Sequence, residues 1–111
     1  MAAIEILRRY DEVIRYVDEL KKERDLLIRR LNRIEGLEPY PSETNFVLVK
    51  LDPSLDAEEL AKGLLEEGIA VQWYRDRYLP NHLRISVGTR EMNEALLKSL
   101  EALVEKGRRE E

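Results

Sequence analysis

A single arginine stands in the middle of a short apolar segment near the C-terminal end of the sequence. In "LRISVG" (83–88), three apolar residues alternate with Arg84 and Ser86, which is the period-two pattern of a half-buried strand. A guanidinium is always charged and presents a rigid fork that can bind a carboxylate through two hydrogen bonds. Arg84 is therefore a candidate anchor for an acid, and a structural ion pair with one of the many glutamates is the alternative.

A second candidate surface lies in "VQWYRDRY" (71–78), which combines aromatic residues with arginines. Tryptophan, tyrosine and arginine are enriched at the energetic centres of protein interfaces. The alternative is that the tryptophan and one tyrosine cover the edge of the core while the arginines are solvated. The candidate interface residues are Trp73, Tyr74, Arg75, Arg77 and Tyr78.

The other reactive residue types have no spacing that predicts catalysis. His82 is the only histidine, and its position beside a proline-containing loop predicts a solvent-facing residue without a partner carboxylate. With no cysteine and one histidine, no metal site is expected. The glycines are isolated, which excludes a glycine-rich phosphate loop, and no serine has a base at triad-like spacing. The residues by themselves predict no catalytic set.

The composition predicts one soluble domain over residues 1–111. The chain is 43% apolar and 38% charged, which excludes disorder, and its net charge of -4 argues against nucleic acid as a partner. No apolar run approaches the roughly 18 residues that a membrane-spanning helix needs. The absence of cysteine is compatible with a reducing cytosol, and we expect a cytoplasmic location.

The first third of the sequence predicts one long amphipathic helix over residues 1–35. Apolar residues recur there at steps of three and four with charged residues between them. Asp11 is a candidate cap at which this helix could be interrupted. Gly36 is expected to end it, and the two prolines that follow predict an extended connection.

The remainder, residues 44–106, predicts alternating strands and helices. Residues 44–51, 69–74 and 83–88 are expected strands, with an eight-residue loop, 75–82, between the last two. Asp56 is the expected N-cap of a second helix that stops at Gly68, and Thr89 is the expected N-cap of the last. The order α-β-α-β-β-α predicts an α+β fold of two layers, with helices packed on one face of a small, mostly antiparallel sheet.

Three segments of the sequence resemble a known family. "GLEPYPSETNFVLVKL" (36–51), "AEELAKGLLEEGIAV" (57–71) and "LRISVGTREMNEALLKSLEAL" (83–103) are similar to the C-terminal small domain of histidinol-phosphate aminotransferases. More broadly, they resemble fold type I aminotransferases, which depend on pyridoxal phosphate. The resemblance extends from about Ala2 to Leu103.

The resemblance assigns a role to the arginine. In the family, the arginine of this strand binds the α-carboxylate of the substrate, which implies that role for Arg84. It also places Asn45 on a strand bordering the same cleft, as a second substrate-binding candidate. The cofactor lysine of the family lies in a large domain, and no lysine here stands in the corresponding motif. The resemblance therefore implies pyridoxal phosphate in the intact enzyme, no cofactor in this chain, and the large domain as its partner.

One position departs from the family pattern. Histidinol-phosphate aminotransferases carry a second arginine, which contacts the substrate phosphate, at the position that Gln72 occupies here. Arg75 or Arg77 is a candidate substitute. Without one, the resemblance favours a related enzyme, such as a threonine-phosphate decarboxylase or another aminotransferase, or a deliberately altered sequence.

The sequence thus leads to one main hypothesis and two alternatives. The first is an isolated or engineered small domain of an aminotransferase that provides Arg84 in the intact enzyme and is inactive alone. The second is a non-catalytic module that binds another protein, or forms a homo-oligomer through exposed apolar surface on the first helix and the Trp73 segment. A regulatory domain that binds amino acids through Arg84 is a third.

Overall fold

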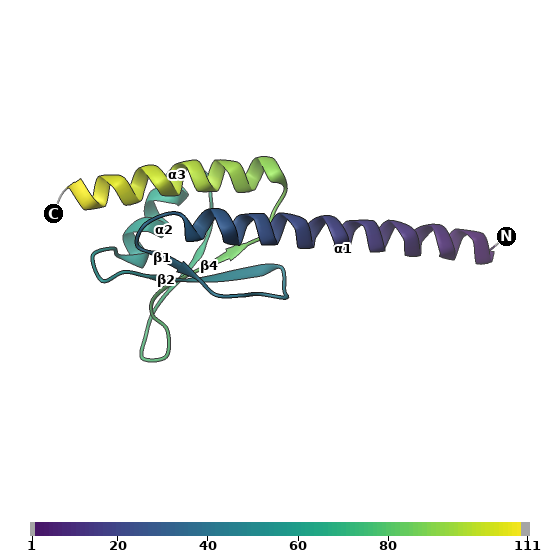
Figure 1. Cartoon of the computed structure of the whole chain (residues 1–111), viewed down its shortest axis with the longest axis horizontal. Coiled ribbons are helices and arrows are strands. Elements are labelled where there is room, and N and C mark those ends of the chain that lie inside the picture. Colours follow the sequence, from purple (N-terminus) through teal and green to yellow (C-terminus); the bar gives the residue numbers. More distant parts are fainter. Residues whose placement is uncertain (1, 110–111) are drawn as a thin grey trace.

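The computed structural model describes the backbone of residues 2–109 and the side chains of residues 9–107. Three helices lie on one face of a small sheet (Figure 1), which confirms the predicted α+β class and its layers. The elements in chain order are α1 (Ala2–Asn32), β1 (Leu37–Pro39), β2 (Phe46–Leu51), α2 (Ala57–Glu66), β3 (Gln72–Arg75), β4 (Pro80–Ser86) and α3 (Arg90–Arg109).

The sheet has four strands in the order β1-β2-β4-β3, and all three pairings are antiparallel. The short strand β1 was not predicted, because three residues are too few to show a period. It pairs Leu37 with Leu51 and Pro39 with Val49. Pro39 is compatible with this position because β1 is an edge strand, where a missing N–H donor leaves no neighbour unpaired.

The hairpin between β3 and β4 is tighter than expected. The prediction of a loop over residues 75–82 is wrong, since β3 ends at Arg75 and β4 begins at Pro80. Asn81 has a φ of 67°, in the left-handed region that asparagine tolerates well. Its side chain accepts a hydrogen bond from the Ala57 N–H at 2.8 Å and donates one to the Leu55 carbonyl at 2.9 Å. These bonds tie the start of β4 to the start of α2.

The first helix is continuous, so the predicted interruption near Asp11 is wrong. Its C-terminal half carries Leu27 and Leu31 into the core, and Ile34, just after the helix, joins them. Its N-terminal half projects past the sheet and past α3 (Figure 1), which gives the molecule extents of 64 × 29 × 23 Å. Among the side chains described, residues 9–19 are all exposed, so the amphipathic pattern has no packing partner there.

The predicted caps and the stop at Gly68 are confirmed, whereas the first helix ends at Asn32, earlier than the predicted end at Gly36. Asp56 accepts a hydrogen bond from the Glu59 N–H at 3.1 Å, and the Thr89 hydroxyl accepts one from the Met92 N–H at 3.2 Å. Gly68 has a φ of 83° just after α2. These features define both ends of α2 and the start of α3, and so set how their apolar faces meet the sheet.

Candidate functional site

The strand that carries Arg84 separates an apolar face from a polar one. Leu83 and Ile85 of β4 are buried under the helices, while Arg84 is half-buried and Ser86 exposed on the other face. The sequence prediction of these two faces is confirmed. Cross-strand neighbours of Arg84 on the uncovered face are Leu48 of β2 and Gln72 of β3.

The guanidinium of Arg84 lies against an aromatic ring. Its central carbon is 4.7 Å from the centroid of the Phe46 ring, which is a cation–π contact. The predicted alternative, a structural ion pair with a glutamate, finds no support among the described side chains. The ion pairs between them involve Arg24, Arg30, Lys62, Arg75 and Arg90. Arg84 is thus a half-buried cation on the uncovered sheet face, in contact with an aromatic ring.

Asn45 lies just before β2 and is exposed. Its carbonyl accepts a hydrogen bond from the Val87 N–H at 2.8 Å, which closes the end of the β2–β4 ladder. Asn45 is therefore three residues along the sheet from Leu48, the residue opposite Arg84. Arg84 thus lies within β4, whereas Asn45 lies just outside β2 and at a different level of the sheet.

The prediction for His82 is wrong. It lies within β4 and is only 4% exposed, with its ring stacked on Tyr40 at a centroid distance of 5.8 Å. Nδ1 is 3.1 Å from the Pro80 carbonyl, which can only accept, so a neutral ring carries its proton there. Nε2 then accepts from the Tyr40 hydroxyl at 3.3 Å. The imidazole is a packed structural group, because a strand replaces the expected loop.

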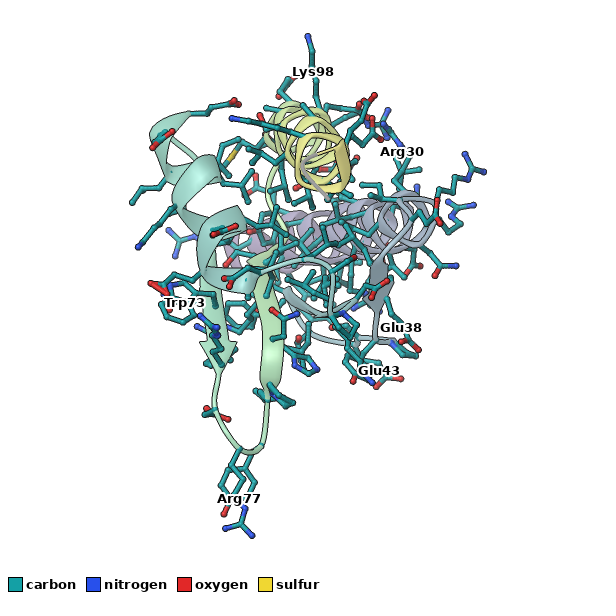
Figure 2. The ribbon with its side chains drawn as sticks, turned by 90° about the vertical axis from the view of Figure 1, so that its left-hand side faces the viewer. Arg30, Glu38, Glu43, Trp73, Arg77 and Lys98 are labelled. Carbon is teal, nitrogen blue, oxygen red and sulfur yellow. The ribbon has the colours of Figure 1, made fainter. Side chains whose placement is uncertain are left out.

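The aromatic and basic residues of the β3–β4 hairpin are dispersed. Trp73 is opposite the buried Leu83, on the helix side of the edge strand, whereas Tyr74 is opposite His82 on the uncovered side. Arg77 lies at the tip and points away from the body (Figure 2), and Tyr78 beside it is 85% exposed. The five candidate interface residues therefore do not form one patch.

The two candidate substitutes for the missing arginine are also directed elsewhere. Arg75 is at the far end of β3 from Gln72 and contacts the carboxylates of Asp56 at 3.4 Å and Glu58 at 3.8 Å. Arg77 is at the hairpin tip (Figure 2). Gln72, by contrast, is directly opposite Arg84. The position where an arginine was expected is thus beside Arg84, and a neutral amide occupies it.

The described residues do not fit pyridoxal phosphate. A lysine that forms a Schiff base is activated by desolvation or by a neighbouring cation, and all six lysines here are exposed: Lys21, Lys22, Lys50, Lys62, Lys98 and Lys106. Among residues 9–107 no group of three or more potential metal ligands is found. No helix in the described part is long and apolar enough to cross a bilayer. The uncovered sheet face, which carries Arg84, has the chemistry to bind an anion.

Sequence reasoning missed the aromatic residues that surround the basic strand. Phe46 of β2 contacts Arg84, and Tyr40, which follows β1, contacts His82. Both contacts depend on the pairing register, which a strand pattern does not contain. The only signal was the period-two alternation in residues 44–51, which places Phe46 and Leu48 on one face.

This two-layer domain matches part of a known protein family. A family model described as aminotransferase class I and II matches residues 1–100, so the chain belongs to this family, whose members depend on pyridoxal phosphate. The resemblance predicted from the three sequence segments is confirmed.

Similar proteins include histidinol-phosphate aminotransferases and a related decarboxylase. The histidinol-phosphate aminotransferase of Thermoanaerobacter pseudethanolicus is 42% identical over 89 residues, which are 79% of this chain and 24% of that protein. The solved histidinol-phosphate aminotransferase of Clostridium acetobutylicum matches 96% of this chain and 32% of its own, with a TM-score of 0.81 and 26% identity. The L-threonine-O-3-phosphate decarboxylase of Porphyromonas gingivalis matches 79% of this chain and 28% of its own, with a TM-score of 0.73 and 31% identity. The chain spans about a quarter of the length of the curated relatives it matches.

Proposed function

We propose that this chain acts as the substrate-closing small domain of a pyridoxal-phosphate-dependent aminotransferase, and that Arg84 binds the α-carboxylate of the substrate. The observation that carries the proposal is a half-buried guanidinium on an uncovered sheet face, with no ion pair to any described carboxylate. A carboxylate placed against it would complete two charge-assisted hydrogen bonds. We further propose that the whole chain is one domain and that Asn45 borders the same site.

On this proposal, the large domain of the enzyme and this small domain have separate roles. The exposed lysines of this chain support a model in which the cofactor is held by the larger remainder of the enzyme, as its partner. The role of this domain is to orient: by fixing the carboxylate, Arg84 would hold the reacting bond in line with the cofactor. On this proposal the chain alone is inactive.

Gln72 bears on the substrate class. A neutral amide beside Arg84 can donate and accept hydrogen bonds, but it lacks the charge that favours a phosphate dianion. We infer that the substrate is an amino acid whose side chain is not bound by an arginine of β3. Arg75, which is paired with two carboxylates, supports this inference.

A grafted enzyme tests the proposal. The matching 89-residue segment of the Thermoanaerobacter pseudethanolicus relative would be replaced by the corresponding residues of this chain. We expect the graft to exchange the amino group between L-glutamate and isotopically labelled 2-oxoglutarate, an assay that needs no phosphate substrate. We expect no exchange by the purified chain alone or by the relative lacking the segment.

Two outcomes would overturn the proposal. One is a graft that folds and binds pyridoxal phosphate but exchanges no amino group between the two acids. The other is exchange catalysed by the purified chain without a large domain, because the residues described here provide no cofactor lysine.

The exposed stripe on α1 favours a second candidate function, self-association. Five large apolar side chains in its projecting half are exposed, and a groove of about 540 Å³ between α1 and the start of α3 continues the stripe. A contiguous apolar surface of several hundred Å² is unusual on a monomer and marks a contact site. The stripe residues are Tyr10, Val13, Ile14, Tyr16 and Val17.

Light scattering across a concentration series distinguishes this candidate. If α1 mediates a homodimer, the mass rises to twice that of the chain, and the double variant Val13→Glu, Ile14→Glu restores the monomer. A matched double variant on the exposed polar side, Glu12→Gln and Arg15→Gln, should leave the dimer intact. A wild-type mass that stays monomeric at about 0.5 mM, a high protein concentration for a weak dimer, would exclude self-association.

A further inference from the structure

The segment before β2 holds one strand residue through side-chain hydroxyls. Phe46 is the first residue of β2, and its N–H and carbonyl point away from β4, because the ladder bond is made by the neighbouring Asn45 carbonyl. On that side the backbone pairing ends at Tyr40, whose N–H donates to the Leu48 carbonyl at 2.9 Å. The backbone of Phe46 therefore has no strand partner on its outer edge.

Two hydroxyls replace that partner. The Phe46 N–H donates to Thr44 Oγ1 at 3.2 Å, and the Phe46 carbonyl accepts from Ser42 Oγ at 2.5 Å and from Thr44 Oγ1 at 3.2 Å. The Thr44 N–H donates to Ser42 Oγ at 3.1 Å. Both backbone polar groups of Phe46 are thus satisfied, so its backbone is fixed where an edge strand would otherwise fray.

The side chain of Phe46, whose backbone is fixed in this way, contacts Arg84 and restricts its position. The two residues are diagonal neighbours on the uncovered face, since Phe46 is opposite Ser86, two residues along β4. The guanidinium carbon lies 4.7 Å from the ring centroid. A ring against the flat side of a guanidinium leaves its in-plane N–H groups available and restricts a side chain that is otherwise rich in rotamers.

We propose that Phe46, held by the hydroxyls of Ser42 and Thr44, is a positioning residue that fixes the plane of the Arg84 guanidinium for a carboxylate. This inference rests on the proposed function of Arg84. The inference assigns a role to Ser42, Thr44 and Phe46 in the "YPSETNF" segment, in addition to the role proposed for Asn45. A cation–π contact at a partly exposed site corresponds to about a two- to fivefold effect on carboxylate binding.

Nuclear magnetic resonance of the purified chain tests the inference with acetate as the probe. The Arg84 Nε–Hε signal, assigned through Arg84→Lys, should be shifted upfield by the ring current and should respond to sodium acetate but not to equal sodium chloride. Phe46→Leu should abolish the upfield shift and raise the acetate dissociation constant about two- to fivefold. Phe46→Trp should retain both properties, and Thr44→Val should reduce the upfield shift.

The control and the contradicting outcomes are distinct. Tyr78→Leu removes an aromatic ring at the hairpin tip and should change neither property, and equal melting temperatures of Phe46→Leu and wild type exclude unfolding as the cause. An Arg84 signal or acetate affinity that is unchanged in Phe46→Leu overturns the positioning role while the proposed function stands. An upfield-shifted Arg84 signal in wild type that does not respond to acetate overturns the proposed function, and the positioning role with it.

Discussion

Replacing Arg84 with glutamine in the grafted aminotransferase is expected to lower kcat/KM for the glutamate exchange by about 100-fold. Glutamine retains hydrogen-bonding capacity but removes the charge and the planar fork that match a carboxylate. Losing one member of a desolvated, hydrogen-bonded charge pair costs about 2–5 kcal/mol, and each 1.4 kcal/mol corresponds to a factor of ten. The measurement is a steady-state comparison of the graft and its Arg84→Gln variant.

Lys50 provides the matched control for this prediction. It is an exposed cation of β2 on the same uncovered face, opposite His82. Lys50→Gln removes the same unit charge, so we expect kcat/KM to stay within about twofold, because an exposed charge contributes little in water. Equal losses in the two variants would reduce the effect to the general charge of the face, and an Arg84→Gln loss below threefold would contradict the anchor role.

The largest expected effect on stability comes from the hydrophobic core and is tested with two adjacent leucines of α2. Leu64 is 0% exposed and belongs to the hydrophobic core, whereas Leu65 is 63% exposed. Leu64→Ala removes buried methyl groups and leaves a cavity, so it should lower the free energy of unfolding by about 3 kcal/mol. Leu65→Ala should change it by less than about 0.5 kcal/mol.

Urea unfolding followed by circular dichroism measures both changes. The slope of the unfolding free energy against urea should be the same for the two variants, because the surface exposed on unfolding is similar. If Leu65→Ala destabilised the chain as much as Leu64→Ala, the packing of α2 against the sheet would be wrong.

The elements that could be predicted from the sequence are those whose ends are set by residues close together in the chain. The caps at Asp56 and Thr89 and the turn at Gly68 depend on residues within a few positions, and all three were predicted. The strand β1 and the tight β3–β4 hairpin were missed because their evidence is not local. β1 exists only through its pairing with β2, and the hairpin is fixed by Asn81 contacts to residues more than 20 positions away.

The same distinction explains the site. The alternation around Arg84 is a local pattern, so its position on the uncovered face could be predicted. Its neighbours could not, because Phe46 and Gln72 reach it only through the register of two strand pairings. His82 failed for a related reason: its burial results from a ring stacked on it from Tyr40, 42 positions away in the chain.

The continuity of α1 has a mechanical consequence. Its C-terminal half is fixed in the core, so the projecting half must follow every rotation of the sheet on which Arg84 lies. At 1.5 Å per residue, residues 2–19 extend about 27 Å beyond that fixed half, and a tilt of about 5° would displace their far end by roughly 2 Å. With no interruption at Asp11 to absorb the bend, α1 moves as a rigid rod with the sheet that carries Arg84.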